Sequence, residues 1–231
     1  MPLAGVGFDL DHTLAIDNKL ERVAFLHLLG FLLERGGRAM GTLAEESDRI
    51  DDLLAHQRSG AFSIDDAVRR FTMERGVVPS DEYVERFRAL ALEMAPAFVI
   101  PLPGVKRTVA TLRERGVTVA VLSNGWNPLQ EIKAKLAGFE GVVLASADIG
   151  VQKPDPRTFA ALLETLGTVA ADTWYVGDDP KGDVCGAAAC GLNAVWIDAE
   201  GKKYPSDLPA PPYTIGALEE LLALVPGGAV L

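Results

Sequence analysis

The spacing of apolar residues predicts a helical segment in the first part of the chain. A short apolar run at Leu3 to Gly7 reads as a buried strand. After it, apolar residues recur every three to four positions, and Gly- and Pro-containing turns interrupt the pattern. The predicted helices are Leu20–Glu34, Leu43–Gln57, Ile64–Arg75 and Asp81–Ala95. Since each has one apolar face, we expect them to pack together as a small bundle.

From residue 105 onward, strand-like apolar runs alternate with helical periodicity. The predicted strands are Val117–Leu122, Gly141–Ala145, Thr173–Val176, Ala194–Ile197 and Tyr213–Ile215. The predicted helices are Val105–Arg115, Asn127–Leu136, Pro156–Leu166, Gly182–Cys190 and Leu218–Leu224. This alternation is typical of right-handed βαβ units and a parallel sheet. We therefore predict an α/β protein with a Rossmann-like doubly wound parallel sheet, formed by residues 1–15 and 98–231, into which an all-helical domain at residues 16–97 is inserted.

Polar residues cluster in the segments that follow the predicted strands. In chain order they are Asp9 and Asp11, Ser123 and Asn124, Lys153, and the acidic group Asp178, Asp179 and Asp183. A parallel sheet brings the carboxyl ends of its strands to one edge, so these groups should meet there. Carboxylates, a hydroxyl and an ammonium group together predict a site for phosphate and a metal ion.

Asp9 and Asp11 follow the first predicted strand and lie one residue apart. Two like charges at the end of a buried strand need a cation or hydrogen-bond donors to offset their repulsion and desolvation. Carboxylate oxygens are hard ligands that suit Mg²⁺, an ion that commonly accompanies phosphate. The pair alone would also fit an ordinary turn with two exposed acids, and the other polar clusters favour the site.

These segments resemble the four sequence motifs of the haloacid dehalogenase superfamily, in the order and at the distances typical of it. Phe8 to Leu14 is similar to the first motif, Leu122 to Gly125 to the second, Lys153-Pro154 to the third, and Gly177 to Asp183 to the fourth. The resemblance implies that the inserted helical domain is a cap of the first type. It also favours the phosphatase-like branch of the superfamily.

The resemblance implies roles for the acidic residues. Asp9 is expected to attack phosphorus and form an aspartyl-phosphate, and Asp11 to act as general acid and then general base. Mg²⁺ is expected to bind Asp9, the backbone carbonyl of Asp11, and Asp178. Asp183 and Asp179 are expected to support the metal site from behind these ligands, with Asp179 the weaker candidate.

The remaining motif residues are expected to bind phosphate or to support the loop. The Ser123 hydroxyl, the Asn124 backbone N–H and the Lys153 ammonium are expected to contact the phosphoryl oxygens. Thr13 is expected to support the loop that follows the first strand. Together these roles predict a Mg²⁺-dependent phosphomonoesterase acting on the phosphate ester of a small metabolite.

Three other functions remain open at this point. A phosphomutase of the β-phosphoglucomutase type shares Asp9 and Asp11 but returns the phosphoryl group to a sugar. A 2-haloacid dehalogenase has the same fold but typically lacks an acid two residues after the nucleophile, because a halide leaves without a proton. A non-catalytic binding protein would be expected to carry a damaged motif, and all four motifs are intact.

Composition limits the partners and the compartment. The net charge of −10 and the pI near 4.8 argue against nucleic acid or an anionic membrane as a partner. The apolar stretch Val23 to Leu33 is too short to span a membrane. Cys185 and Cys190 are expected to be small buried residues without a disulfide, and no signal peptide is apparent. We therefore expect a cytoplasmic protein, with its oligomeric state undetermined.

Overall fold

The computed structural model describes residues 4–198 and 201–225, and these divide into two compact units. The core unit comprises Met1–Asp17 and Val99–Leu231, and the helical unit comprises Asn18–Phe98. The sequence pattern placed the corresponding boundaries at 15/16 and 97/98. Leu3, where the first strand was predicted to begin, lies outside the described residues.

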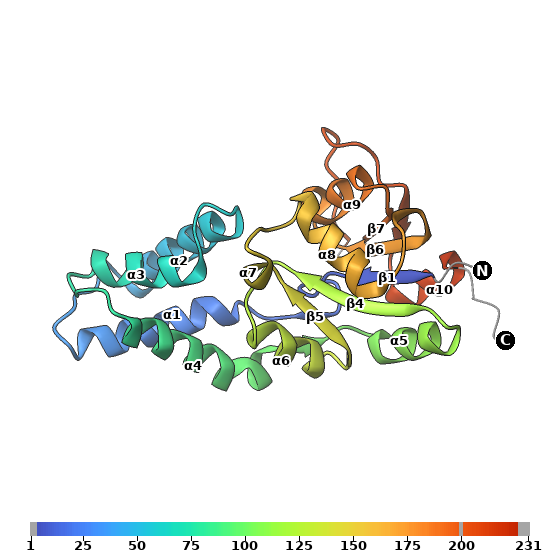
Figure 1. Ribbon diagram of the computed structural model, residues 1–231. Coiled ribbons are helices and arrows are strands. Elements are labelled where there is room, and N and C mark those ends of the chain that lie inside the picture. The colour runs from blue at the N-terminus through green and yellow to red at the C-terminus, as the bar shows by residue number, and fades with distance from the viewer. Residues whose placement is uncertain (1–3, 199–200, 226–231) are drawn as a thin grey trace. The chain divides into compact units, whose positions relative to one another are not determined.

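The core unit contains a six-stranded parallel sheet with the strand order β5-β4-β1-β6-β7-β8. The strands are β1 (Gly5–Phe8), β4 (Thr118–Ser123), β5 (Val142–Ala145), β6 (Thr173–Gly177), β7 (Asn193–Ile197) and β8 (Tyr213–Ile215). Figure 1 shows α5 (Val105–Glu114) and α6 (Leu129–Leu136) on one side of the sheet and α8 (Pro156–Leu166) on the other. The predicted doubly wound α/β fold is confirmed.

Close packing around β1 depends on a glycine. A Cβ atom at Gly7 would lie 2.4 Å from a Leu162 methyl carbon and 2.8 Å from the Tyr175 ring. Both neighbours belong to a buried cluster that fills the space between the sheet and α8. Gly7 therefore lets α8 and Tyr175 approach the strand that leads directly into Asp9.

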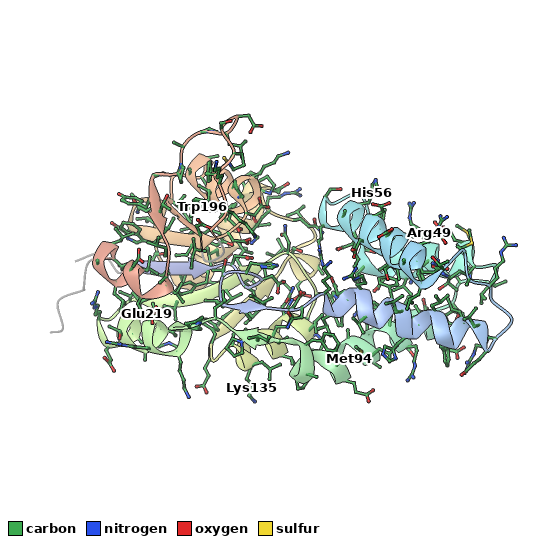
Figure 2. All side chains as sticks on the ribbon, turned by 180° about the vertical axis from the view of Figure 1, so that it is seen from behind. Arg49, His56, Met94, Lys135, Trp196 and Glu219 are labelled. Atoms are coloured by element: carbon green, nitrogen blue, oxygen red, sulfur yellow. The ribbon has the colours of Figure 1, made fainter. Side chains whose placement is uncertain are left out.

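The helical unit consists of α1 (Leu20–Leu33), α2 (Leu43–Arg58), α3 (Ile64–Glu74) and α4 (Asp81–Phe98). Capping boxes begin α2, at Thr42, and α3, at Ser63. The Phe25 ring packs against those of Phe71 and Phe87, at centroid distances of 4.9 and 4.5 Å. Exposed Arg49 and His56 lie along α2 (Figure 2). Within the described residues, no helix has the length and apolar character needed to cross a membrane.

Several elements differ from the sequence expectation. The helix predicted at 182–190 is a π-helical turn at Pro180–Cys185 followed by the short helix α9 (Gly186–Ala189). The helix predicted to end at Ala95 continues through Pro96 to Phe98. Short strands β2 (Ala15–Ile16) and β3 (Ile100–Pro101) pair antiparallel. They were not predicted, because a strand of two residues is too short to show the alternation of apolar and polar residues.

Four smaller elements complete the core unit: α7 (Ser146–Ile149), α10 (Leu221–Leu224), and 3₁₀ turns at Ala170–Asp172 and Leu218–Glu220. The last helix was predicted as one continuous segment at 218–224. Cys185 and Cys190 are free thiols, but they are half-buried rather than fully buried. The burial expected for these two cysteines from the sequence is therefore only partial.

Candidate active site

Asp9 lies at the carboxyl end of β1, between the ends of two neighbouring strands. In the sheet, Phe8 pairs with Val121 of β4 on one side and with Val176 of β6 on the other. The Asp9 backbone N–H donates to the Val176 carbonyl at 2.8 Å, which continues the ladder by one residue. The carboxyl ends of β4, β1 and β6 thus meet at one edge, as the motif spacing predicted.

Lys153 is the cationic centre of this edge. Its ammonium donates to Asp9 Oδ1 at 2.6 Å, to Asp183 Oδ1 at 2.7 Å and to the Tyr175 hydroxyl at 3.0 Å. All four side chains are buried. Three donors with three acceptors satisfy the ammonium group, which is the condition for keeping a lysine inside a protein.

Asn124 fixes the backbone at Lys153. Its side-chain carbonyl accepts from the Lys153 N–H at 2.8 Å, and its side-chain amide donates to the Lys153 carbonyl at 3.2 Å. The sequence assigned Asn124 a phosphate contact through its backbone N–H, and that contact stays a prediction. Asn124 has an additional structural role, because its two side-chain hydrogen bonds connect the end of β4 to the loop before α8.

Asp9, Asp178 and Asp183 form a carboxylate cluster. One oxygen from each lies within 4.8 Å of the others. Both Asp183 oxygens already accept hydrogen bonds, Oδ1 from Lys153 and Oδ2 from the Asp179 N–H at 3.0 Å. These bonds leave Asp183 with less capacity for a metal ion, and the supporting position expected for it stays a prediction.

Asp179 has a local structural role. Its carboxylate accepts from the Lys181 N–H at 2.9 Å and caps the π-helical turn that begins at Pro180. The Val184 N–H then bonds back to the Asp179 carbonyl at 3.2 Å, the wide spacing of a π-turn. Asp179 is exposed and stands outside the carboxylate cluster. The metal-site role expected of Asp179 stays a prediction, and it would act through the turn that carries Asp183.

Burial and mutual repulsion shift the ionisation of these acids. Burial raises the pKa of Asp9 to about 7, with contributions from the charges of Asp183 and Asp11, while Lys153 opposes the shift. Burial, together with the Asp9 charge, raises the pKa of Asp178 to about 6. Burial alone would lower the pKa of Lys153, but Asp183 and Asp9 raise it well above its usual value. The cluster thus has excess negative charge, which a divalent cation would offset.

Asp11 lies in the loop after β1 and is paired with a buried lysine. The Lys133 ammonium, on α6, forms ion pairs with Asp11 Oδ1 and with Asp17 Oδ2. Sequence reasoning missed both Lys133 and Asp17. A lysine at a buried position of an amphipathic helix was the one available signal, and the helix pattern alone does not show which carboxylate it would meet.

Ser123 and Thr13 are both buried, and the roles predicted for them stay predictions. Ser123 is the last residue of β4 and is 1% exposed, at the same edge of the sheet as Asp9. Thr13 is fully buried, and its hydroxyl has no hydrogen-bond partner among the described residues. Any support that Thr13 gives to the loop therefore comes from packing rather than from a side-chain hydrogen bond.

Tyr175 is a further site residue that sequence reasoning missed, because its position inside β6 reads as core. Its hydroxyl donates to the Leu122 carbonyl at 2.9 Å and accepts from Lys153, and its ring packs edge-on against Phe159 at 5.2 Å. Burial raises the pKa of Tyr175 well above its usual value, so the hydroxyl stays neutral. The neutral Tyr175 hydroxyl therefore accepts a hydrogen bond from the Lys153 ammonium without adding a charge to the site.

Replacing Tyr175 with phenylalanine is expected to lower kcat/KM about 10-fold, because Lys153 loses one of its three acceptors. Loss of the hydrogen bond from the Tyr175 hydroxyl to the Leu122 carbonyl should cost about 1 kcal/mol of unfolding free energy. Steady-state kinetics and thermal unfolding measure the two effects. Tyr213→Phe, the same change at an exposed tyrosine of β8, is the matched control. Equal activity of the two variants would contradict the role given to Tyr175.

Comparison with known proteins identifies the family. Residues 4–191 match the family model described as haloacid dehalogenase-like hydrolase. The chain belongs to this family. The four motifs that carried the resemblance in the sequence all lie within the matched residues, so the family assignment made from them is confirmed.

Proteins and solved structures whose names give different activities resemble this chain. It is 37% identical over 140 residues to phosphoserine phosphatase of Thermus thermophilus, a match that covers 57% of this chain and 56% of that protein. The chain thus spans only about half the length of this relative. A phosphatase structure from Thermococcus onnurineus has a TM-score of 0.73 and 26% identity, covering 99% of this chain and 100% of that one. A 2-haloacid dehalogenase structure from Pseudomonas syringae has a TM-score of 0.71 and 26% identity, covering 96% and 97%.

Proposed function

We propose that this protein is a phosphomonoesterase that hydrolyses a small-metabolite phosphate ester through an aspartyl-phosphate, with Mg²⁺ as cofactor. The observation that carries the proposal is the Asp9 carboxylate, buried at the end of β1 and held at 2.6 Å by the Lys153 ammonium. A nucleophile next to a fixed cation suits attack on an anionic phosphoryl group. The similarity to phosphatases supports the same conclusion.

The proposed reaction has two displacements. In the first, an Asp9 oxygen bonds to phosphorus, the bond from phosphorus to the ester oxygen breaks, and Asp11 gives its proton to the leaving alcohol. In the second, Asp11 takes a proton from water, the water oxygen bonds to phosphorus, and the bond to Asp9 breaks. Free phosphate and the original carboxylate of Asp9 result. Lys153, Ser123 and the Asn124 backbone hold the phosphoryl oxygens in both steps.

The donor set fits a hard divalent cation. Asp9 and Asp178 contribute carboxylate oxygens from the cluster, and the Asp11 backbone carbonyl is the third proposed protein ligand. Bound there, Mg²⁺ would offset the negative charge of the nucleophile and the phosphate. Burial raises the pKa of both Asp9 and Asp178, and a bound cation would favour their ionised forms.

Mg²⁺ is expected to stabilise the protein more at pH 8 than at pH 5. The pKa of Asp9 rises from 3.8 to about 7 on folding, so the folded protein holds more protons than the unfolded chain between these values. In the metal-free protein this contribution to stability is fully present below pH 3.8 and is lost as the pH rises through about 7. At pH 5 protons also compete with the metal for the carboxylates.

Thermal unfolding with Mg²⁺ and with chelator, at both pH values, measures this difference. The Mg²⁺-induced increase in Tm should be larger at pH 8, and Asp178→Asn should reduce it at both pH values. Because only the difference between the two metal conditions is compared, other titrating groups largely cancel. Equal increases at the two pH values would contradict the proposed ligand set.

The experiment that tests the function is phosphate release from a panel of small phosphate esters, with Mg²⁺ and with chelator. Release that requires Mg²⁺ supports the proposal, and the best ester defines the substrate class. Halide release from 2-haloacids that persists in chelator would instead show a dehalogenase. Phosphoryl transfer between positions of a sugar phosphate, with little free phosphate, would show a mutase.

A further inference from the structure

Lys133 is buried within α6, and its ammonium group contacts two carboxylates of the core unit. It pairs with Asp11 Oδ1 and, at 3.2 Å, with Asp17 Oδ2. The Lys133 side chain is 3% exposed, whereas that of Asp11 is 31% exposed. Burying an ammonium group is costly unless carboxylates or other acceptors surround it. The arrangement is thus a built contact and differs from the ion pairs of flexible surface side chains.

Asp17 provides Lys133 with a second partner on a fixed segment of chain. It follows β2, whose register with β3 pairs Ala15 with Pro101 and Ile16 with Ile100. The Asp17 side chain is 13% exposed. Because Asp17 holds the ammonium group independently, Lys133 remains paired in a reaction during which Asp11 carries a proton.

The backbone around Asp11 is ordered by its own hydrogen bonds. The His12 N–H donates to the Ala15 carbonyl at 2.7 Å, and the Leu14 N–H donates to the Leu10 carbonyl at 2.9 Å. These bonds fix the course of the loop, but they leave the direction of the Asp11 carboxyl open. The carboxyl itself forms the ion pair with the Lys133 ammonium.

We propose that Lys133 is a positioning residue that holds the Asp11 carboxyl in place for proton transfer to the leaving alcohol. The inference rests on the proposed function, because that reaction needs a proton donor at Asp11. A misplaced acid should slow the departure of a basic alkoxide much more than that of a nitrophenolate, which leaves readily without a proton. A general structural role would slow both reactions equally.

The test compares kcat/KM for two esters, 4-nitrophenyl phosphate and the alkyl phosphate that the wild-type enzyme hydrolyses best. Lys133→Met is expected to lower kcat/KM about 30-fold or more for the alkyl ester and less than about 3-fold for the nitrophenyl ester. The ratio of the two values does not depend on the fraction of folded protein, so partial misfolding of the variant does not obscure it.

Lys135→Met is the matched control, since Lys135 is an exposed lysine on the same helix, two residues away (Figure 2). It should leave both values unchanged. A double-mutant cycle adds a second readout: in an Asp11→Asn background, Lys133→Met should cause no further change in the ratio. This non-additivity is expected only if Lys133 acts through Asp11.

Two outcomes would overturn the inference, and they are distinguishable. If the wild-type enzyme hydrolyses both esters and Lys133→Met lowers both values by the same factor, Lys133 is a structural residue and the proposed function stands. If the wild-type protein hydrolyses neither ester with Mg²⁺ present, the proposed function is wrong and the inference fails with it.

Discussion

Asp9→Asn is expected to reduce phosphate release by a factor on the order of 10⁴, the largest effect of any single substitution in this protein. The amide is nearly the same size as the carboxylate but cannot form the bond to phosphorus that the proposed reaction requires. It also removes one of the two charges that Lys153 contacts, while Asp183 still pairs with that ammonium at 2.7 Å. The variant should therefore fold, and initial rates with saturating Mg²⁺ and ester measure the loss.

Asp207→Asn is the matched control for this experiment, because Asp207 is an exposed aspartate of the same unit. Its rate should equal that of the wild-type enzyme. In chelator, Asp9→Asn should unfold at a higher temperature than the wild type at pH 8, since the substitution removes a buried carboxylate whose pKa is raised to about 7. Retention of more than a tenth of the wild-type rate would show that Asp9 is not the nucleophile.

Lys153→Met is expected to lower kcat/KM by about 10²–10³-fold and to destabilise the metal-free protein by about 3 kcal/mol. The substitution keeps the length of the side chain but removes the cation that faces Asp9 and Asp183. Two buried carboxylates then lack their counter-charge, and Tyr175 loses a hydrogen-bond donor. Kinetics and chemical denaturation in chelator measure the two losses separately.

Lys181→Met provides the control for the loss of a lysine, because Lys181 is exposed on the neighbouring π-helical turn. Mg²⁺ should restore part of the stability of Lys153→Met, since a bound cation replaces some of the missing charge. Full activity in Lys153→Met would contradict the assignment of this lysine to the phosphoryl group. Unchanged stability would contradict the charge balance described for the carboxylate cluster.

Much of the fold could be predicted because its elements have strong and separate periodicities. The strand at Tyr213–Ile215 and the helix at Pro156–Leu166 agree with the sequence expectation at both ends. The differences occur where local signals are weak or conflict. The helix predicted to end at Ala95 continues through Pro96 to Phe98. The π-turn at Pro180 depends on hydrogen bonds that the Asp179 carbonyl accepts, which a helical pattern cannot reveal.

The site was predictable where chemistry-bearing residues follow strands, and less so where side chains come from elsewhere. Asp9, Lys153 and Asp183 are brought together as the motifs predicted. In the sequence, Tyr175 looks like an ordinary core residue of β6. Its part in the site is recognised only from the structure, where its hydroxyl accepts a hydrogen bond from Lys153. Lys133 and Asp11 are more than a hundred residues apart in the sequence, so no local sequence pattern predicts their ion pair.

The most direct test of the account is to identify the residue that carries the phosphoryl group during turnover. Wild-type enzyme is mixed with Mg²⁺ and its best ester, quenched in acid within the first turnovers, digested and analysed by mass spectrometry. We expect one phosphoryl group on the peptide that contains Asp9, and none on this peptide in Asp9→Asn. A phosphoryl group on another residue, with Asp9→Asn still releasing phosphate at the wild-type rate, would contradict it.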